Sequence, residues 1–147
     1  MSLFQSFAIN SSGMTAERFR SDIIAENVAN VSTTRDENGD VYTRQVVTFE
    51  EKRLSALRHV LESKRGDFRG DGVKVSSVQE DTSSDYIMEY DPSHPDADEN
   101  GYVTYPNVNI VTEMTNLIDA SRAYEANATA FEASKSLAST GLGVGQG

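Results

Sequence analysis

The sequence contains no cysteine, only 3 prolines among its 147 residues and no long run of apolar side chains. The missing cysteine excludes disulfide bonds, thiol catalysis and thiolate metal sites. No stretch approaches the roughly 18 apolar residues that a membrane span needs, so we expect no transmembrane helix. The glycine and proline contents do not indicate disorder, and the length is typical of one domain.

A basic surface is also missing. The net charge is −10, and the acidic excess is local, because residues 76–106 contain eight acidic side chains and no lysine or arginine. Nucleic acids and anionic membranes attract basic stripes. Both are therefore excluded as partners, and we expect no direct membrane insertion.

The N-terminus lacks the features of a cleavable secretion signal. It has no basic segment, and its apolar residues are interrupted by Asn10, Ser11, Ser12 and Gly13 before an apolar core forms. If the protein is exported, we expect a route that leaves this end uncleaved.

Both ends of the chain show the periodicity of long helices. From Leu3 to Val31 a mostly apolar stripe recurs in alternating steps of four and three, which is heptad spacing. A similar stripe runs from Ile110 to Phe131, with many alanines that favour helix formation and close helix contacts. The glycine-rich tail over residues 139–147 is expected to end this second helix.

Between the helices the period changes to that of short strands. Strand signals occur at residues 41–49, 72–78 and 85–90. In the last of these, Tyr86, Met88 and Tyr90 fall on one face. Residues 51–61 fit a short helix and residues 64–72 fit a loop. The middle of the chain is therefore predicted to be a small β-rich segment.

The stretch DADENGYVTYPN begins like a calcium-binding loop, with oxygen-bearing side chains at positions one, three and five and a glycine at position six. These residues are Asp96, Asp98, Asn100 and Gly101. The twelfth position is Asn107 where an EF-hand has a bidentate glutamate. The sequence DENG also occurs at residues 36–39, which favours tight turns at both places. A calcium-dependent binding module using Asp96–Gly101 stays open as an alternative function.

Catalytic interpretations have little support. Ser93, His94 and Asp96 are close in sequence, but the members of a triad must converge in space. Neither His59 nor His94 has a helix-spaced metal partner. We expect no enzyme activity and no catalytic, cofactor or metal residue, with a small hydrolase acting through the acidic segment or its His94 as a third alternative.

Three segments resemble one family. Residues 11–33 end in an Asn-x-x-Asn-x-x-Thr pattern that resembles the N-terminal motif of flagellar rod and hook proteins. Residues 106–137 resemble the C-terminal helix shared by that family, and residues 90–109 resemble the linker of its proximal-rod subunits. The short length also fits those subunits, because hook and distal-rod relatives have larger middle segments. The positions that match the family motifs are Asn27, Asn30, Thr33, Asp91, Pro92, Pro95, Asp96, Gly101, Tyr102, Pro106, Asn107, Glu113, Met114, Arg122 and Tyr124.

The resemblance implies a structural protein without a cofactor. Rod subunits of this family stack helically in the basal body of the bacterial flagellum, forming the periplasmic drive shaft that transmits motor torque for motility. The implied partners are copies of the chain itself, other rod subunits and basal-body proteins. The flagellar type III export apparatus, which exports rod subunits without cleavage, is a further implied partner.

The fold class that we expect is α+β. A helix over residues 1–31 pairs, as an antiparallel coiled coil, with a helix and glycine-rich tail over residues 106–147. A small β-rich domain with the acidic linker spans residues 32–105. Both stripes are imperfect, which suits helices that touch several neighbours. The expected assembly interface consists of Leu3, Phe7, Met14, Ile24, Val28, Met114, Leu117, Tyr124 and Phe131.

Overall fold

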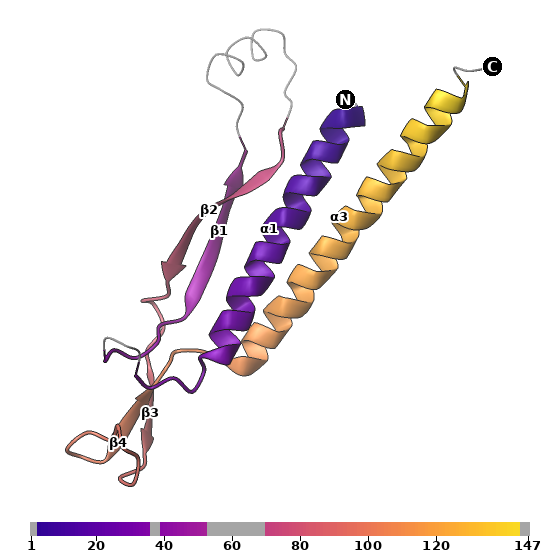
Figure 1. Cartoon of the computed structure of the whole chain (residues 1–147). Coiled ribbons are helices and arrows are strands. Elements are labelled where there is room, and N and C mark those ends of the chain that lie inside the picture. The colour runs from indigo at the N-terminus through magenta and orange to yellow at the C-terminus, as the bar shows by residue number, and fades with distance from the viewer. Residues whose placement is uncertain (1–2, 36–38, 53–69, 145–147) are drawn as a thin grey trace, which may run out of the picture. The chain divides into compact units, whose positions relative to one another are not determined.

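A computed structural model describes residues 3–35, 39–52 and 70–144 of the chain (Figure 1). Its elements in order are helix α1 (Leu3–Ala29), strands β1 (Gln45–Glu51), β2 (Val73–Glu80), β3 (Ile87–Tyr90) and β4 (Tyr102–Tyr105), and helix α3 (Ile110–Val144). Strand β1 pairs with β2 and strand β3 pairs with β4, which gives two sheets of two strands. Long terminal helices around small middle sheets agree with the expected α+β class.

The ends of the elements differ from the sequence-based expectations in several places. Helix α3 continues to Val144, well into the glycine-rich tail that was expected to end it, so the helix is longer than predicted. Each glycine weakens a helix by only about 1 kcal/mol relative to alanine, and Gly141 and Gly143 are separated by a helix-favouring leucine. Strand β4 was not predicted, because it lay in the segment interpreted as a linker. The expected helix over residues 51–61 lies, from residue 53 on, outside the described residues.

The chain forms two compact units. Unit 1 consists of Met1–Phe19, Thr48–Ser77 and Ala120–Gly147, and unit 2 consists of Arg20–Val47 and Val78–Asp119. Each unit therefore contains part of α1, part of α3 and part of the strand region. The contacts are given below for each unit by itself.

In unit 1 the first half of α1 lies against the last part of α3. The rings of Phe7 and Phe131 have their centroids 5.0 Å apart. Further along α1, a Cβ placed on Gly13 would lie 2.7 Å from Oδ1 of Asn127. Residue numbers rise along one helix as they fall along the other, so these two helix segments run antiparallel. The absence of a side chain on Gly13 allows their close approach.

Strand β2 begins against the same half of α1. The Ser12 hydroxyl donates a hydrogen bond to the Ile9 carbonyl at 2.7 Å and accepts one from the Val73 backbone N–H at 3.1 Å. Gly72 precedes Val73 with φ +97°, and a Cβ there would collide with the Ser12 hydroxyl. A left-handed backbone and the lack of space both require glycine at this position.

In unit 2, β3 and β4 form an antiparallel pair in which Ile87 lies opposite Tyr105 and Tyr90 lies opposite Tyr102. The segment between the strands turns tightly before β4, because the Gly101 N–H bonds to the Asp98 carbonyl at 3.0 Å. Gly101 has φ +83°, a conformation that favours glycine. The expected turn at residues 98–101 is confirmed.

Candidate functional site

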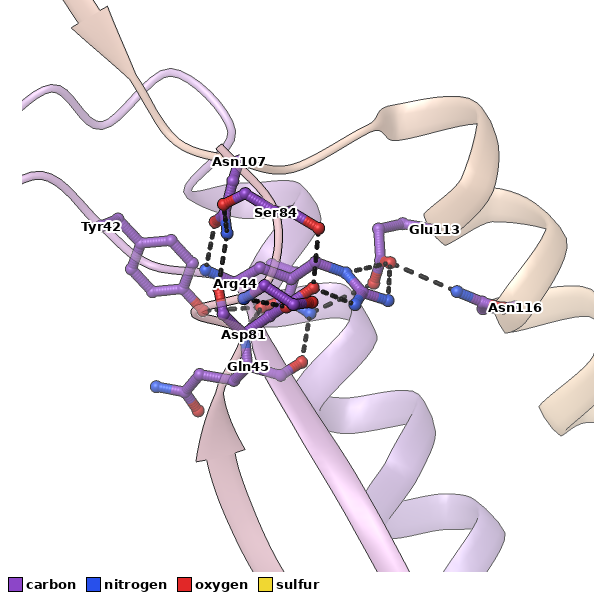
Figure 2. A network of polar contacts seen from close by, with 10 residues as sticks. Tyr42, Arg44, Gln45, Asp81, Ser84, Asn107, Glu113 and Asn116 are labelled. Atoms are coloured by element: carbon purple, nitrogen blue, oxygen red, sulfur yellow. Dashed lines mark hydrogen bonds and ion pairs between the residues drawn. The ribbon is translucent and has the colours of Figure 1, made fainter. Parts of the chain in front are cut away.

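Unit 2 contains a cluster of polar side chains between the end of α1, the start of α3 and the strand region (Figure 2). We call this cluster the polar junction. It consists of Asn27, Tyr42, Arg44, Gln45, Asp81, Ser84, Asn107, Glu113 and Asn116. Its members come from five separate stretches of the sequence, so the cluster connects elements that are distant along the chain.

Asn27 connects the last turns of α1 to the start of β1. Its side chain is 0% exposed and three residues after the buried Ile24, so both side chains lie on the inner face of the helix. Its Nδ2 donates to the Gln45 carbonyl at 2.8 Å, and its Oδ1 accepts from the Gln45 N–H at 2.8 Å. The Tyr42 hydroxyl also donates to Oδ1, at 2.9 Å. The amide thus acts on Gln45 as a neighbouring strand would.

Arg44 and Glu113 form the charged centre of the junction. The Arg44 Nε and Nη2 groups donate to Oε1 of Glu113 at 2.9 and 2.8 Å. Glu113 is 0% exposed, and its other oxygen accepts from Asn27 Nδ2 at 3.1 Å. Asn116, one turn further along α3, donates to Oε1 at 3.3 Å. A buried carboxylate needs such compensation, because an unpaired charge in the interior is strongly destabilising.

Asn107 makes a second set of side-chain bonds to the backbone. Its Oδ1 accepts from the Arg44 N–H at 2.8 Å. Its Nδ2 donates to the carbonyls of Asp81 and Ser84 at 2.7 and 3.1 Å. These bonds satisfy a backbone N–H group just before β1 and two carbonyl groups just after β2. A neighbouring strand would otherwise have to form hydrogen bonds with such groups. Together, Asn27 and Asn107 hold consecutive residues of the chain, Arg44 and Gln45.

Asp81 is the second carboxylate that contacts Arg44. Its Oδ2 accepts from Arg44 Nη1 at 3.1 Å, and its Oδ1 accepts from the hydroxyl and the N–H of Ser83 at 2.5 and 3.0 Å. The Ser83 hydrogen bonds, followed by those of Arg44 and Ser84, lower the pKa of Asp81 from 3.8 to about 2. Asp81 therefore stays ionised well below neutral pH.

Two further side chains of the cluster have shifted pKa values. Burial disfavours the charge on Arg44, but the hydrogen bonds and charges of Glu113 and Asp81 outweigh it, and the pKa of Arg44 is raised. Burial, together with the nearby carboxylates of Glu26 and Glu113, raises the pKa of Tyr42 from 10.0 to about 12. Tyr42 therefore stays neutral and Arg44 stays charged near neutral pH.

The sequence PNVN leads into the junction from the other side. Asn109 is the N-cap of α3, since its Oδ1 accepts from the backbone N–H groups of Val111 and Thr112 at 3.0 and 3.2 Å. Glu113 lies in the first turn of α3, where a negative charge is favoured by the helix dipole. The cap fixes where the helix begins, and so aims Glu113 at Arg44.

The acidic loop between β3 and β4 is held by its own turns. Asp98 Oδ1 accepts from the N–H groups of Asn100 and Tyr102, each at 2.8 Å. Asp96 accepts from the Thr34 hydroxyl at 2.8 Å and pairs with Arg35 at 3.3 Å. These carboxylates therefore serve turns and a link to the segment after α1. Within residues 3–35, 39–52 and 70–144, no group of three or more His, Cys, Asp or Glu side chains is placed to hold a metal ion.

The residues considered for hydrolysis do not form a triad. The Ser93 hydroxyl donates to Asp91 at 2.6 Å, and His94 Nδ1 accepts from the Asp96 backbone N–H at 3.1 Å. The Ser93 bonds lower the pKa of Asp91, and the bond from the Tyr102 N–H, with others, lowers the pKa of Asp98. Each of these groups is committed to a turn, so Ser93 is not activated by a base.

The residues of the expected assembly interface lie in different surroundings. Phe7 and Phe131 are in contact within unit 1, and Ile24 is buried in unit 2. Met14, Val28 and Leu117 are half-buried, whereas Met114 and Tyr124 are exposed. Leu3 begins α1. The set therefore divides into side chains packed within the chain and side chains facing outwards.

The structure brings three of the family-motif residues, Asn27, Asn107 and Glu113, into the polar junction. The remaining positions have other places. Asn30 and Thr33 form a hydrogen bond with each other after α1. The loop before β4 contains Asp91, Pro92, Pro95, Asp96 and Gly101, and β4 starts at Tyr102. Pro106 is buried, and the exposed positions on α3 are Met114, Arg122 and Tyr124.

Tyr42, Arg44 and Asp81 belong to the junction but were not among the predicted residues. Arg44 and Asp81 had no visible partner in the sequence, since Arg44 lies 69 residues before Glu113. The available signal was an arginine directly before an apolar strand, a position where a charge needs a buried partner. The junction contains no activated nucleophile. What it can do is hold helix ends and strands in fixed relation within unit 2.

Comparison with known proteins agrees with this structural role. Residues 7–35 match the family model described as flagella basal body rod protein, and residues 99–144 match the flagellar basal body rod FlgEFG protein C-terminal model. These ranges include Asn27, Asn107 and Glu113 of the polar junction. In the described part of the chain, neither helix is both long and apolar enough to span a membrane. The matches define the class: a rod protein of the flagellar basal body.

Relatives of similar length extend the match to the whole chain. The chain is 43% identical to the flagellar basal-body rod protein FlgC of Borreliella burgdorferi, with 100% of both chains covered. It is 40% identical to FlgC of Bacillus subtilis, over 99% of this chain and 100% of the relative. The identity to FlgC of Salmonella typhimurium is 35% over the same shares. The chain belongs to the FlgC family of flagellar basal-body rod proteins.

Proposed function

We propose that the chain is a structural subunit of the proximal rod, which assembles helically with copies of itself and with other rod subunits. The resulting shaft crosses the periplasm and transmits torque from the motor. The family membership supports this proposal, because the relatives are basal-body rod proteins by name. Passage through the flagellar type III export apparatus, without cleavage, belongs to the same proposal.

The observation that carries the proposal is an exposed apolar stripe on α3. Val111, Met114 and Ile118 are 74%, 54% and 54% exposed. They are three and four residues apart, so they lie on one face of the helix. Apolar side chains that recur on one helix face are normally buried against a neighbour. In the rod, that neighbour would be a helix of another subunit.

The terminal helices would then serve two purposes. Within a subunit they would pair as an antiparallel coiled coil, which the Phe7–Phe131 contact in unit 1 supports. Between subunits they would contribute the proposed interface, with residues 1–31 and 106–147 in the wall of the rod and residues 32–105 outside it. The polar junction suits such a part, because it holds the end of α1, the start of α3 and the strand region of unit 2 together.

A charged substitution on the exposed stripe tests this proposal. Met114→Asp should leave the unfolding free energy of the isolated chain within about 0.5 kcal/mol of the wild type, because the side chain is at the surface. It should nevertheless abolish incorporation into basal bodies and motility. Leu117→Asp and Phe7→Asp should also abolish incorporation, but with some loss of stability, since both side chains are half-buried.

Thr112→Asp is the matched control, because Thr112 is exposed on the same helix and outside the apolar stripe. It should support normal swimming in soft agar. A Met114→Asp strain that swims and assembles rods as the wild type does would show that this helix face is not an assembly surface.

A further inference from the structure

Unit 1 contains a groove between α1 and the strand pair β1–β2, with a volume of about 580 Å³. Small side chains of α1 line one wall, among them Ala8, Ser12 and Ala16, and Val73 and Val75 of β2 line the other. The three α1 residues are spaced four apart and so lie on one face of the helix. Because their side chains are short, a hollow remains that longer side chains would fill.

Most of the surface of this groove is apolar. Phe19, which also lines it, is 39% exposed, although phenylalanine is usually buried. Among the described lining residues the charged side chains are Lys52 and Lys74, and none is acidic. Lys74 is paired with Glu50 at 2.6 Å, which neutralises part of this positive charge, whereas Lys52 is exposed. The groove therefore suits an apolar partner surface with a negative charge at its border.

The exposed stripe on α3, which consists of Val111, Met114 and Ile118, has this character. It belongs to unit 2 and carries large side chains on a helix, whereas the α1 wall of the groove carries small ones. Large and small side chains of two facing helices interdigitate. Asp119 follows Ile118 directly and is exposed at the border of the stripe. Stripe and groove are thus complementary in shape, in apolar character and in charge.

The charge of the whole chain is divided unequally between the two units. Unit 1 contains 10 lysine and arginine residues against 8 acidic residues, whereas unit 2 contains 3 against 15. The net charges are therefore +2 for unit 1 and −12 for unit 2. Two copies of unit 2 repel each other, so charge favours contact of unit 2 with unit 1 of another copy.

We propose that the exposed stripe on α3 of one copy docks in the unit 1 groove of the next copy. In this contact Met114 and Ile118 cover Phe19, and Asp119 lies beside Lys52. The contact joins two different surfaces, so every docked copy still offers one groove or one stripe to a further copy. Repetition of such a contact gives an open helix unless the rotation closes a ring. The inference rests on the proposed function as a rod subunit and names the surface that the stripe contacts.

Cross-linking in assembled basal bodies tests this contact. The chain has no cysteine, so single cysteines can be introduced in the groove, as Thr15→Cys, and beside the stripe, as Thr115→Cys. Both positions are exposed. Basal bodies from a strain that produces both single-cysteine chains are treated with a short bismaleimide, and the linked peptides are identified by mass spectrometry. The link between positions 15 and 115 should be at least fivefold more abundant than a link between identical positions.

The matched control replaces Thr115→Cys with Ala133→Cys, which lies at an exposed position of α3 within unit 1. Its link to position 15 should be at least fivefold less abundant. A dominant link between two copies of position 115, or between position 115 and another rod protein, would show that the stripe has a different partner. Rods that assemble without the link between positions 15 and 115 would overturn the inference and leave the proposed function intact.

Reversal of the two charges gives a second test. Lys52→Glu and Asp119→Lys should each lower the amount of the chain in purified basal bodies at least fivefold, because each places like charges together. The double variant should return to within twofold of the wild type. The control is Lys135→Glu, which reverses an exposed lysine of unit 1 outside the groove and should not rescue Asp119→Lys. Rescue by Lys135→Glu, or no rescue by Lys52→Glu, would contradict the docking even where Met114→Asp blocks assembly.

Discussion

The side chain of Asn27 forms both hydrogen bonds that a neighbouring strand would form with Gln45, one to the carbonyl and one from the N–H, each at 2.8 Å. A residue of a helix thus takes the place of a strand at the start of β1. This arrangement ties the direction of α1 to the direction of the strand. The predictions below follow from this relationship and from other close contacts within each unit.

Replacing Asn27 with aspartate tests the strand-like pairing. Asn27→Asp turns a donor into a second oxygen that faces the Gln45 carbonyl and the Glu113 carboxylate. An uncompensated buried charge costs about 3–5 kcal/mol, so the unfolding free energy in urea should fall by about that amount. Asn30→Ala, one turn later with local bonds only, should cost about 1 kcal/mol or less. Equal losses in the two variants would contradict the special role of Asn27.

The charge of Glu113 should be needed to compensate Arg44. Glu113→Gln keeps the shape but leaves Arg44 with Asp81 as its remaining carboxylate, and a lost charge-assisted hydrogen bond costs about 1.5–3 kcal/mol. Calorimetric melting and urea unfolding measure this loss. The control is Glu125→Gln on the exposed side of α3, which should stay within about 0.5 kcal/mol of the wild type.

A double-mutant cycle separates the pair from its surroundings. Arg44→Met and Glu113→Leu should each destabilise the chain, and the double variant should lose less than the sum by about 0.5–3 kcal/mol. Strict additivity of the two losses would mean that the short distances between Arg44 and Glu113 do not correspond to energetic coupling.

Gly13 and Asn127 should also be energetically coupled, but through a steric clash and not through an attraction. Alanine stabilises a helix interior by about 1 kcal/mol relative to glycine, but a Cβ at Gly13 would lie 2.7 Å from Asn127 Oδ1. Gly13→Ala should therefore destabilise the wild-type chain and stabilise a chain that already carries Asn127→Ala. Thermal melting of the four chains in the cycle measures this. The same effect of Gly13→Ala in both backgrounds would contradict a close approach of α1 and α3 in unit 1.

Tyr42 should make the chain sensitive to alkaline pH. Because its pKa rises from 10.0 to about 12 on folding, its proton is held more tightly in the folded state. The stabilisation is complete below pH 10 and is lost as the pH rises towards 12. Tyr42→Phe should show a smaller fall in unfolding free energy over this range. A fall in Tyr42→Phe as large as that of the wild type would disprove the assignment.

The elements with regular periodicity were the most predictable. The heptad pattern of residues 3–31 predicted α1 nearly to its end, and the two DENG sequences indicated turns, of which the one at Asp98–Gly101 is described and confirmed. These features depend on local preferences, which a short window of sequence contains. The end of α3 was less predictable, because single glycines among good helix formers weaken a helix without stopping it.

The polar junction was predictable only in part. The family motif singled out Asn27, Asn107 and Glu113, but nothing in the sequence showed that they converge. Asp81 looked like one more member of a solvated acidic run, although it accepts hydrogen bonds from Arg44 and Ser83. Pairing across such separations depends on the tertiary fold, about which local patterns say nothing.

The sequence separation of the residues in the polar junction also determines at what length of chain the fold can become rigid. Glu113, which bonds to both Asn27 and Arg44, lies 86 residues after Asn27 and 69 residues after Arg44. A polypeptide that emerges N-terminus first reaches Glu113 only in its last third. A copy cut short before that point keeps Asp81 for Arg44 and Gln45 for Asn27, but it lacks the buried carboxylate that contacts both side chains. The hydrogen bonds to Glu113, which stabilise the complete subunit, are therefore missing from an incomplete one.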